Sequence, residues 1–370
     1  MSRQERIKGG EPIRYDVQKS GVNKTPEHPG YGEYTVFSPE KDPVRGTIIL
    51  NPGFAEFTSS FKAFAREFVK KGYRVIINEH PKAGALSDAF LQTELDHAKE
   101  SARTYWGRHG CSEKKLNMVL DSIQLATFRE AYSYKIATEH SKEFMNDPSL
   151  PVHVLGHSHG GLYTPIAHLL WPEEFAGRSL TLINPAGLSG KIEDRPHSES
   201  PTVAAAESVR EERVGKAREM FGSRIFRNTE ISLRYLTAAL TAAWKFKKPG
   251  ILFDMLRYTL PRSSRIPLLG YIPILGAMIP GAQTQDEGAG MANTDLRPIL
   301  SILNSADMHT TVMYDTKDGV FPARTIERNP PDAGLIKTEG FGHFGPVHSP
   351  KEYAEIILGR ILMEPAKLKR

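Results

Sequence analysis

The residue types best suited to chemistry lie in the glycine-framed turn Gly156–Gly160, which reads G-H-S-H-G. An apolar, β-branched run from Val152 precedes this turn, and an apolar pattern typical of a helix follows it. Between a strand and a helix, a G-x-S-x-G turn forces its serine into strained backbone geometry and exposes the hydroxyl. Gly156 and Gly160 are expected where a side chain would collide with neighbouring backbone. We therefore predict that Ser158 is a nucleophile; an ordinary glycine-rich turn is the alternative.

A serine hydroxyl needs a base to take its proton and an acid group to orient that base. The base candidates are His343, in a glycine-rich loop after the last predicted strand, and His348 nearby. We select His343 because it lies nearer the strand end and its flanking glycines let the loop bend toward Ser158. The acid candidates are Asp318, in a turn after the preceding strand, and Asp315, closer to the end of that strand. We select Asp318 and keep Asp315 as the alternative acid, since Asp-Gly is also common turn chemistry.

The oxyanion of an acyl-transfer reaction needs backbone N–H donors. One candidate is the amide of His159, the residue after the proposed nucleophile. The other is the amide of Phe54, which follows the turn Asn51-Pro52-Gly53, where Gly53 lets the backbone approach a substrate. A plain strand-to-helix turn is the alternative interpretation of this segment.

Four histidines near the serine raise the question of a metal site: His153, His157, His159 and His168. Alternation along a strand and around a tight turn points such side chains in different directions. No carboxylate completes a recognisable ligand set, so we predict neither a metal nor any other cofactor.

Strand and helix patterns alternate along most of the chain. The predicted strands are the run from Val152 together with Tyr34–Ser38, Thr47–Leu50, Arg74–Asn78, Leu180–Asn184, Thr310–Tyr314 and Leu335–Thr338. The predicted helices are Ser60–Lys71, Leu116–Asn146, Leu296–Leu303 and Lys351–Leu362, with Ala83–Gly110 partly helical. Such alternation predicts an α/β fold with a doubly wound, mostly parallel sheet. Between 189 and 291 the pattern is helical only, so we expect an N-terminal arm (1–32), a core (33–188 and 292–370) and an inserted helical cap (189–291).

The bulk composition narrows the choice of partners. The 370 residues carry a net charge of +5, with basic residues spread along the chain and not interleaved with aromatics, so nucleic-acid binding is not expected. The single cysteine, Cys111, excludes an internal disulfide, and no signal-peptide pattern opens the chain, which favours a cytoplasmic protein. The apolar stretch Ile266–Ala282 contains three prolines and cannot form a membrane-spanning helix. The oligomeric state stays open.

Five short motifs give the chain a resemblance to a known superfamily: Asn51–Phe54, Gly84–Ser87, Gly156–Gly160, Asp318–Pro322 and Gly342–Phe344. In this order they resemble the α/β-hydrolase superfamily, most nearly its monoacylglycerol lipase, lysophospholipase and serine aminopeptidase branch. The resemblance covers Gly46–Leu188 and Ala292–Leu362, and it implies that the intervening helical region caps the active site.

Three positions depart from the pattern of this superfamily. Pro52-Gly53 stands where many relatives have His-Gly, His159 where Met or Gln is common, and His80 near a position that commonly holds Asp. These departures bear on the substrate more than on the reaction.

The combined patterns predict a carboxylesterase- or lipase-like serine hydrolase that cleaves a small-molecule ester through an acyl-enzyme. The proline-stiffened segment Ile266–Ala282 suits a hydrophobic acyl pocket or a transient contact with a membrane or micelle, while ordinary packing of the cap is the alternative. An aminopeptidase, a thioesterase or an acyltransferase could use the same three side chains. A non-catalytic binding protein of this type would ordinarily have lost one of them.

Overall fold

The computed structural model describes the sheet, its flanking helices and a few positions of the predicted cap. The described residues are 2–3, 15–20, 28, 30–40, 43–82, 85–145, 147–188, scattered positions between 237 and 291, 294–306 and 308–359. Nearly all of the predicted cap, including Ile266–Ala282, lies outside these ranges. In the described part of the chain, no helix combines the length and the apolar character needed to cross a bilayer.

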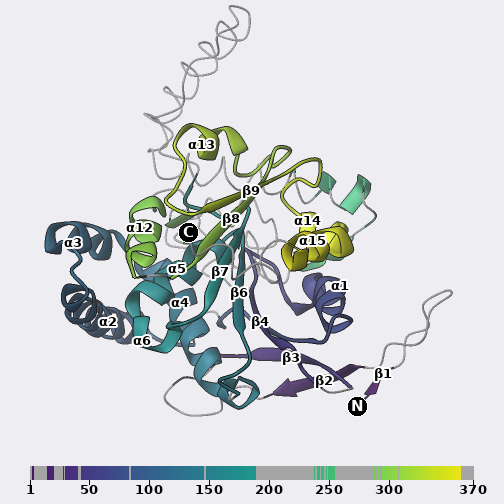
Figure 1. Cartoon of the computed structure of the whole chain (residues 1–370), viewed down its shortest axis with the longest axis horizontal. Coiled ribbons are helices and arrows are strands. Elements are labelled where there is room, and N and C mark those ends of the chain that lie inside the picture. The colour runs from purple at the N-terminus through teal and green to yellow at the C-terminus, as the bar shows by residue number, and fades with distance from the viewer. Residues whose placement is uncertain are drawn as a thin grey trace, which may run out of the picture.

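A single sheet runs through the centre of the molecule, in the strand order β1-β2-β3-β5-β4-β6-β7-β8-β9 (Figure 1). Its strands are β1 (Ser2–Arg3), β2 (Tyr15–Ser20), β3 (Tyr34–Pro39), β4 (Gly46–Asn51), β5 (Tyr73–Asn78), β6 (Val152–His157), β7 (Ser179–Ile183), β8 (Thr310–Asp315) and β9 (Gly334–Thr338). From β5 to β9 every neighbouring pair is parallel, whereas β1, β2 and β3 pair antiparallel at one edge. The predicted α/β class with a mostly parallel sheet is confirmed.

Helices cover both faces of the sheet (Figure 1). One face carries α1 (Thr58–Val69), α14 (Gly345–His348) and α15 (Pro350–Ile357). The other carries α2 (Asp88–Arg108), α3 (Glu113–Ser122), α4 (Leu125–His140), α5 (Gly160–Leu170), α6 (Pro172–Phe175) and α12 (Arg297–Ser305). In β4, Ile48 and Leu50 pack under α1 while Ile49 packs under α5, as the alternation of side chains along a strand requires. Burial on both faces explains why the strands β4 to β8 are largely apolar runs in the sequence.

One expectation from the sequence needs correction. The predicted continuous helix Leu116–Asn146 is divided, because the backbone is extended at Ile123 and Gln124, between α3 and α4. Ile123 is buried in the core in this extended conformation, and neither glycine nor proline marks the break.

Within the N-terminal arm, β2 pairs along its whole length with β3.

The strand ends that lead to the predicted site residues all lie along the same border of the sheet, the one formed by the carboxyl ends of its parallel strands. Parallel strands bring their carboxyl ends together, and ligands of open α/β sheets bind at that edge. Ser158 follows β6, Asp318 follows β8 and His343 follows β9.

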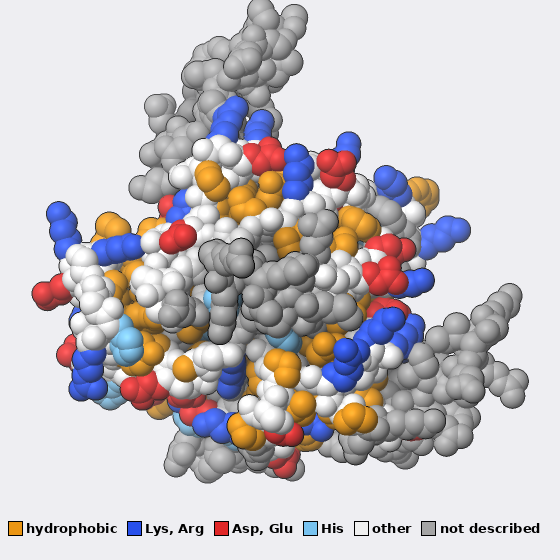
Figure 2. Space-filling view, in the orientation of Figure 1, with side chains coloured by type: hydrophobic (Ala, Val, Ile, Leu, Met, Phe, Trp, Pro, Cys, Tyr) orange, Lys and Arg blue, Asp and Glu red, His pale blue; other side chains and the backbone are white. Residues whose placement is uncertain are grey.

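In the view of Figure 2, Lys and Arg side chains alternate with Asp and Glu around the outline of the described surface and do not gather into one basic patch.

Candidate active site

Ser158 lies at the sharp turn between β6 and α5 and adopts a left-handed backbone conformation, with φ of 52°. Its N–H donates to the carbonyl oxygen of Ile183 (3.0 Å), and its own carbonyl accepts from Gly161 and Ala186 (2.9 Å each). A non-glycine residue in this region is strained by about 1–2 kcal/mol. Such strain persists only where the surroundings fix it, and here three backbone hydrogen bonds do so.

The two glycines that frame the turn have the role predicted for them. A Cβ atom at Gly156 would come within 2.6 Å of the Gly160 carbonyl oxygen. A Cβ atom at Gly160 would overlap the carbonyl oxygen of Asn51 at the end of β4. The turn therefore packs against its own helix and against the neighbouring strand, with no room for a side chain at either position.

Three predicted side chains form a hydrogen-bonded row. The Nε2 atom of His343 lies 2.9 Å from the Ser158 hydroxyl oxygen, and its Nδ1 atom lies 2.9 Å from Oδ2 of Asp318. The other carboxylate oxygen of Asp318 accepts hydrogen bonds from the amides of Val320 (2.7 Å) and Phe321 (2.9 Å). All three members of the row are buried. With Nδ1–H directed at the carboxylate, Nε2 carries the lone pair that can accept the serine proton, which is the arrangement a general base requires.

Asp315, the alternative acid, is engaged elsewhere. Its fully buried carboxylate accepts four hydrogen bonds. The donors are the amides of Lys317 (2.8 Å), Gly342 (2.9 Å) and Phe341 (3.1 Å) and the hydroxyl of Thr338 (3.0 Å). Asp315 thus ties the end of β8 to the loop that carries His343.

Asn184 lies at the site, although no role was predicted for it from the sequence. It follows β7 in a left-handed conformation, with φ of 44°. Its side-chain oxygen accepts from the Asp315 amide (2.9 Å), and its Nδ2 donates to the carbonyls of Gly342 (3.1 Å) and His343 (3.3 Å). The available signal was an amide side chain directly after a buried strand, at the edge where the other site residues gather.

The turn after β4 comes into contact with the serine. A Cβ atom at Gly53 would lie 2.7 Å from Cβ of Ser158, so only glycine lets the backbone approach this closely. The Gly53 amide donates to Oε2 of Glu56 (2.6 Å), and the Gly53 carbonyl accepts from Nε2 of His80 (2.9 Å). The position of Phe54, directly after Gly53, keeps its amide a candidate donor to an oxyanion. That assignment, like the one for His159, stays a prediction.

Two buried imidazole–carboxylate pairs flank this turn. Nδ1 of His157 lies 2.7 Å from Oε2 of Glu56, and its Nε2 lies 2.8 Å from the carbonyl oxygen of His343. Burial alone would lower the pKa of His157, but the Glu56 carboxylate and the His343 carbonyl raise that pKa above its ordinary value. In the second pair, Nδ1 of His80 lies 3.0 Å from Oε2 of Glu130. The sequence singled out His80 only as a departure from its relatives, and neither pairing was predicted.

The other histidines considered from the sequence have different surroundings. His348 contacts the carbonyl of Phe341 (2.5 Å) and the hydroxyl of Ser349 (3.0 Å). Burial lowers the pKa of His153 to about 4 and that of His168 well below its ordinary value. Among the residues that the structure describes, no group of three or more His, Cys, Asp or Glu side chains could hold a metal ion.

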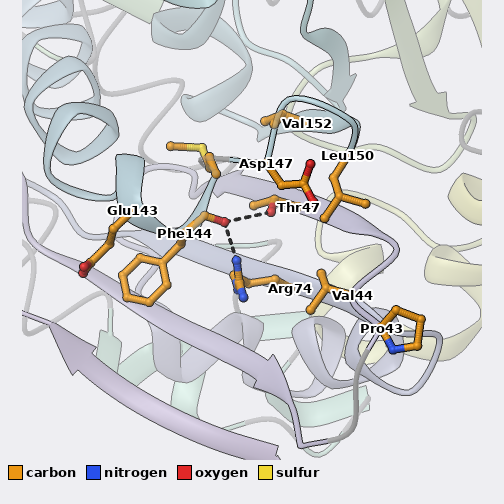
Figure 3. A pocket seen from close by; sticks show the side chains of 10 residues that line it. Pro43, Val44, Thr47, Arg74, Glu143, Phe144, Asp147, Leu150 and Val152 are labelled. Atoms are coloured by element: carbon orange, nitrogen blue, oxygen red, sulfur yellow. Dashed lines mark hydrogen bonds between the residues drawn. The ribbon is translucent and has the colours of Figure 1, made fainter.

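A pocket of about 410 Å³ lies at the opposite edge of the sheet (Figure 3). It is lined at the amino ends of three strands by Thr47, Arg74 and Val152. Arg74 is already bonded to the carbonyl of Phe144, as the dashed line in Figure 3 shows. The serine is at the carboxyl ends of the same sheet, so this pocket takes no part in the candidate site.

Comparison with known proteins gives similarity to solved structures only. No family model matches the chain, and no curated protein matches it. Similar structures include a bromoperoxidase from Bacillus anthracis (15% identity, 93% of this chain and 98% of the other, TM-score 0.45). They also include an esterase from Exiguobacterium antarcticum (15%, 88% and 95%, 0.43) and a thermophilic esterase from Thermogutta terrifontis (15%, 97% and 97%, 0.40).

The chain has the α/β-hydrolase fold. This follows from its own coordinates: a mostly parallel sheet covered on both faces, with a strained serine at the strand-to-helix turn after β6. A fold of this kind supports many reactions, so the site geometry alone carries the functional proposal.

Proposed function

We propose that this chain is a serine hydrolase that cleaves carboxylic esters through an acyl-enzyme. The observation that carries the proposal is the buried row in which His343 bridges the Ser158 hydroxyl and the Asp318 carboxylate, at 2.9 Å on each side. In this proposal Ser158 is the nucleophile, His343 the general base and acid, and Asp318 the group that holds the imidazole in the required tautomer.

The first half of the reaction forms the acyl-enzyme. Ser158 Oγ attacks the ester carbonyl carbon while Nε2 of His343 takes the hydroxyl proton. The carbonyl π electrons move onto oxygen, and the amides of Phe54 and His159 are the proposed donors to that oxyanion. Collapse of the tetrahedral intermediate breaks the bond to the leaving alcohol, which takes the proton from His343.

The second half repeats these steps with water. His343 removes a proton from water, whose oxygen attacks the acyl carbon and forms a second tetrahedral intermediate. When this collapses, the bond to Ser158 Oγ breaks, the serine recovers its proton from His343, and the carboxylic acid leaves. Each donor to the oxyanion typically contributes about 3 kcal/mol to the stability of such intermediates.

The proposal names the substrate only by class, as an ester with a hydrophobic or lipid-like acyl group. One observation argues against an aminopeptidase, which needs an exposed carboxylate for the substrate amine. Glu56, one candidate for that carboxylate, is buried and bonded to Gly53 and His157.

The test is covalent labelling combined with a substrate panel. A fluorophosphonate should modify Ser158 with one equivalent per chain, and Ser158→Ala should abolish both labelling and turnover. Ser141→Ala removes another buried serine hydroxyl, one bonded to Thr138, and should leave both unchanged. p-Nitrophenyl esters of increasing acyl length should be cleaved faster than thioesters or aminoacyl-naphthylamides. A fully active protein without label at Ser158 would remove the proposal.

A further inference from the structure

The buried His80–Glu130 pair contacts the turn that carries one of the proposed oxyanion donors. His80 follows β5, and its side chain and that of Glu130 on α4 are almost completely inaccessible to solvent. Nε2 of His80 lies 2.9 Å from the carbonyl oxygen of Gly53, and Nδ1 lies 3.0 Å from Glu130. The Ser158–His343–Asp318 mechanism makes no use of this pair.

The protonation of the pair is constrained by its partners. A carbonyl oxygen only accepts hydrogen bonds, so the contact with Gly53 requires a proton on Nε2 of His80. The proton between Nδ1 and Glu130 then resides on either the ring or the carboxyl group. In both cases His80 donates to Gly53, and Glu130 holds the ring in place through Nδ1.

Holding the Gly53 carbonyl also orients the next amide. The carbonyl of Gly53 and the N–H of Phe54 belong to one planar trans peptide unit, in which C=O and N–H point in opposite directions. Directing the carbonyl toward His80 therefore directs the Phe54 N–H away from His80. Glycine rotates more freely than any other residue, so at Gly53 this orientation depends on the hydrogen bonds that hold the peptide.

The bond from His80 adds to the restraint on a strained turn. The Gly53 carbonyl also accepts from the Glu56 amide (3.1 Å), which closes a four-residue turn, and the Gly53 amide donates to Oε2 of Glu56 (2.6 Å). Within that turn Ala55 is left-handed, with φ of 58°, a conformation that costs a non-glycine residue about 1–2 kcal/mol. Each hydrogen bond contributes only about 0.5–1.5 kcal/mol, so the strain offsets much of what the bonds within the turn supply, and the bond from His80 favours the closed turn.

We infer that His80, held by Glu130, is a positioning residue that fixes the Gly53–Phe54 peptide so that the Phe54 N–H faces the substrate carbonyl oxygen. This inference rests on the proposed hydrolase function. It assigns His80 a part in stabilising the transition state without contact with substrate. Its loss should lower kcat and leave substrate binding in the ground state intact.

The decisive comparison is between two uncharged double variants. His80→Leu/Glu130→Leu removes both polar groups together, so that no unpaired carboxylate is left buried. His80→Gln/Glu130→Gln keeps an N–H that can reach the Gly53 carbonyl. His168→Leu is the control for loss of a buried histidine elsewhere in the core.

The readouts are kcat and KM for the best p-nitrophenyl ester, and the affinity for a trifluoromethyl ketone, which forms a tetrahedral adduct with the serine. The leucine pair should lower kcat by about 10²-fold with KM almost unchanged, the usual effect of losing one oxyanion donor. The affinity of the leucine pair for the trifluoromethyl ketone should fall by the same factor. The glutamine pair should recover most of the wild-type kcat and most of the affinity for the ketone. His168→Leu should resemble the wild type in both measurements.

Three results would overturn the inference: an unchanged kcat in the leucine pair, a rise in KM in place of a fall in kcat, or no recovery in the glutamine pair. If the leucine pair does not fold, His80→Phe/Glu130→Leu keeps a ring against Phe57, 5.7 Å away between centroids, and takes its place. Failure of the hydrolase proposal is seen separately, because wild-type protein would then not be labelled at Ser158. Normal labelling and an unaffected leucine pair would overturn the role of His80 alone.

Discussion

Replacement of Asp318 by asparagine tests the proposed acid most directly, because the structure determines how the amide must sit. Oδ1 of Asp318 accepts from two backbone amides, those of Val320 and Phe321. The single oxygen of an asparagine will therefore take this position, and its NH₂ group will face Nδ1 of His343. A donor there forces Nδ1 to accept, so the ring proton moves to Nε2, and Nε2 can no longer take the proton of Ser158.

The expected loss is large in rate and small in stability. The same exchange in a triad carboxylate lowers kcat by about 10⁴-fold, which corresponds to about 5 kcal/mol in the activation barrier at about 1.4 kcal/mol per tenfold change. Because the amides of Val320 and Phe321 keep their acceptor, the free energy of unfolding of Asp318→Asn should fall by only about 1 kcal/mol.

Asp315→Asn is the matched control, since it makes the same change three positions away. Here both carboxylate oxygens accept two hydrogen bonds each, so the new NH₂ group faces donors whichever way it turns. Loss of two bonds to a buried charge should lower the free energy of unfolding by about 3 kcal/mol or more. The row of Ser158, His343 and Asp318 remains, so kcat should fall far less than in Asp318→Asn.

The assays are ester hydrolysis and urea denaturation of both variants. Opposite patterns are expected: a slow but stable Asp318→Asn protein and a faster but unstable Asp315→Asn protein. If Asp318→Asn kept more than about a tenth of the wild-type kcat, the tautomer argument would be refuted. If Asp315→Asn were the slower and more stable of the two, the acid would have to be reassigned.

Two further predictions concern the Glu56–His157 pair and the contact of Asp254 with α1. Glu56 raises the pKa of His157 above its ordinary value of about 6.5, so the stability from this pair is complete below about pH 6.5 and is lost as pH rises through the folded-state pKa. In urea titrations across this range, wild type should lose stability as pH rises relative to Glu56→Gln/His157→Gln, which leaves no buried charge unpaired, and a constant difference would contradict the assignment. Asp254 accepts hydrogen bonds from the hydroxyls of Ser59 and Ser60 at the start of α1. If these bonds hold the segment 237–291 against α1, Asp254→Ala should increase the rate of limited proteolysis within that segment. An unchanged cleavage rate would contradict this role of Asp254.

The local pattern of apolar residues was sufficient to predict most of the strands. The parallel strands β4 to β8 are largely apolar runs that are buried on both faces, so their positions follow from composition. For example, the sequence predicts a strand at Arg74–Asn78, and β5 is Tyr73–Asn78. The row Ser158, His343 and Asp318 was chosen because each residue follows a predicted strand, and the carboxyl ends of parallel strands share an edge. The division between α3 and α4 was missed because tertiary packing of Ile123 imposes the extended backbone there.

The supporting contacts could not be predicted in the same way. His157 pairs with Glu56 across 101 residues of sequence, and His80 pairs with Glu130 across 50. A glutamate within a helical pattern ordinarily indicates a solvated face, and nothing local shows that Glu130 is buried. The contacts of Asn184 were also not predictable from local sequence, because its three partners lie in β8 and the His343 loop, more than 100 residues downstream.

The Glu56–His157 pair connects the parts of the site that the sequence keeps apart. Glu56 holds the Gly53 amide after β4, His157 belongs to β6, and its Nε2 holds the carbonyl of His343 after β9. A buried ion pair adds little to stability over apolar residues of similar size, but removal of one partner leaves an uncompensated charge. The net benefit of this pair is therefore geometric: it fixes the turn after β4, the end of β6 and the backbone at His343 relative to one another. Preorganisation of this kind is what allows hydrogen-bond donors to stabilise a transition state without reorganising during the reaction.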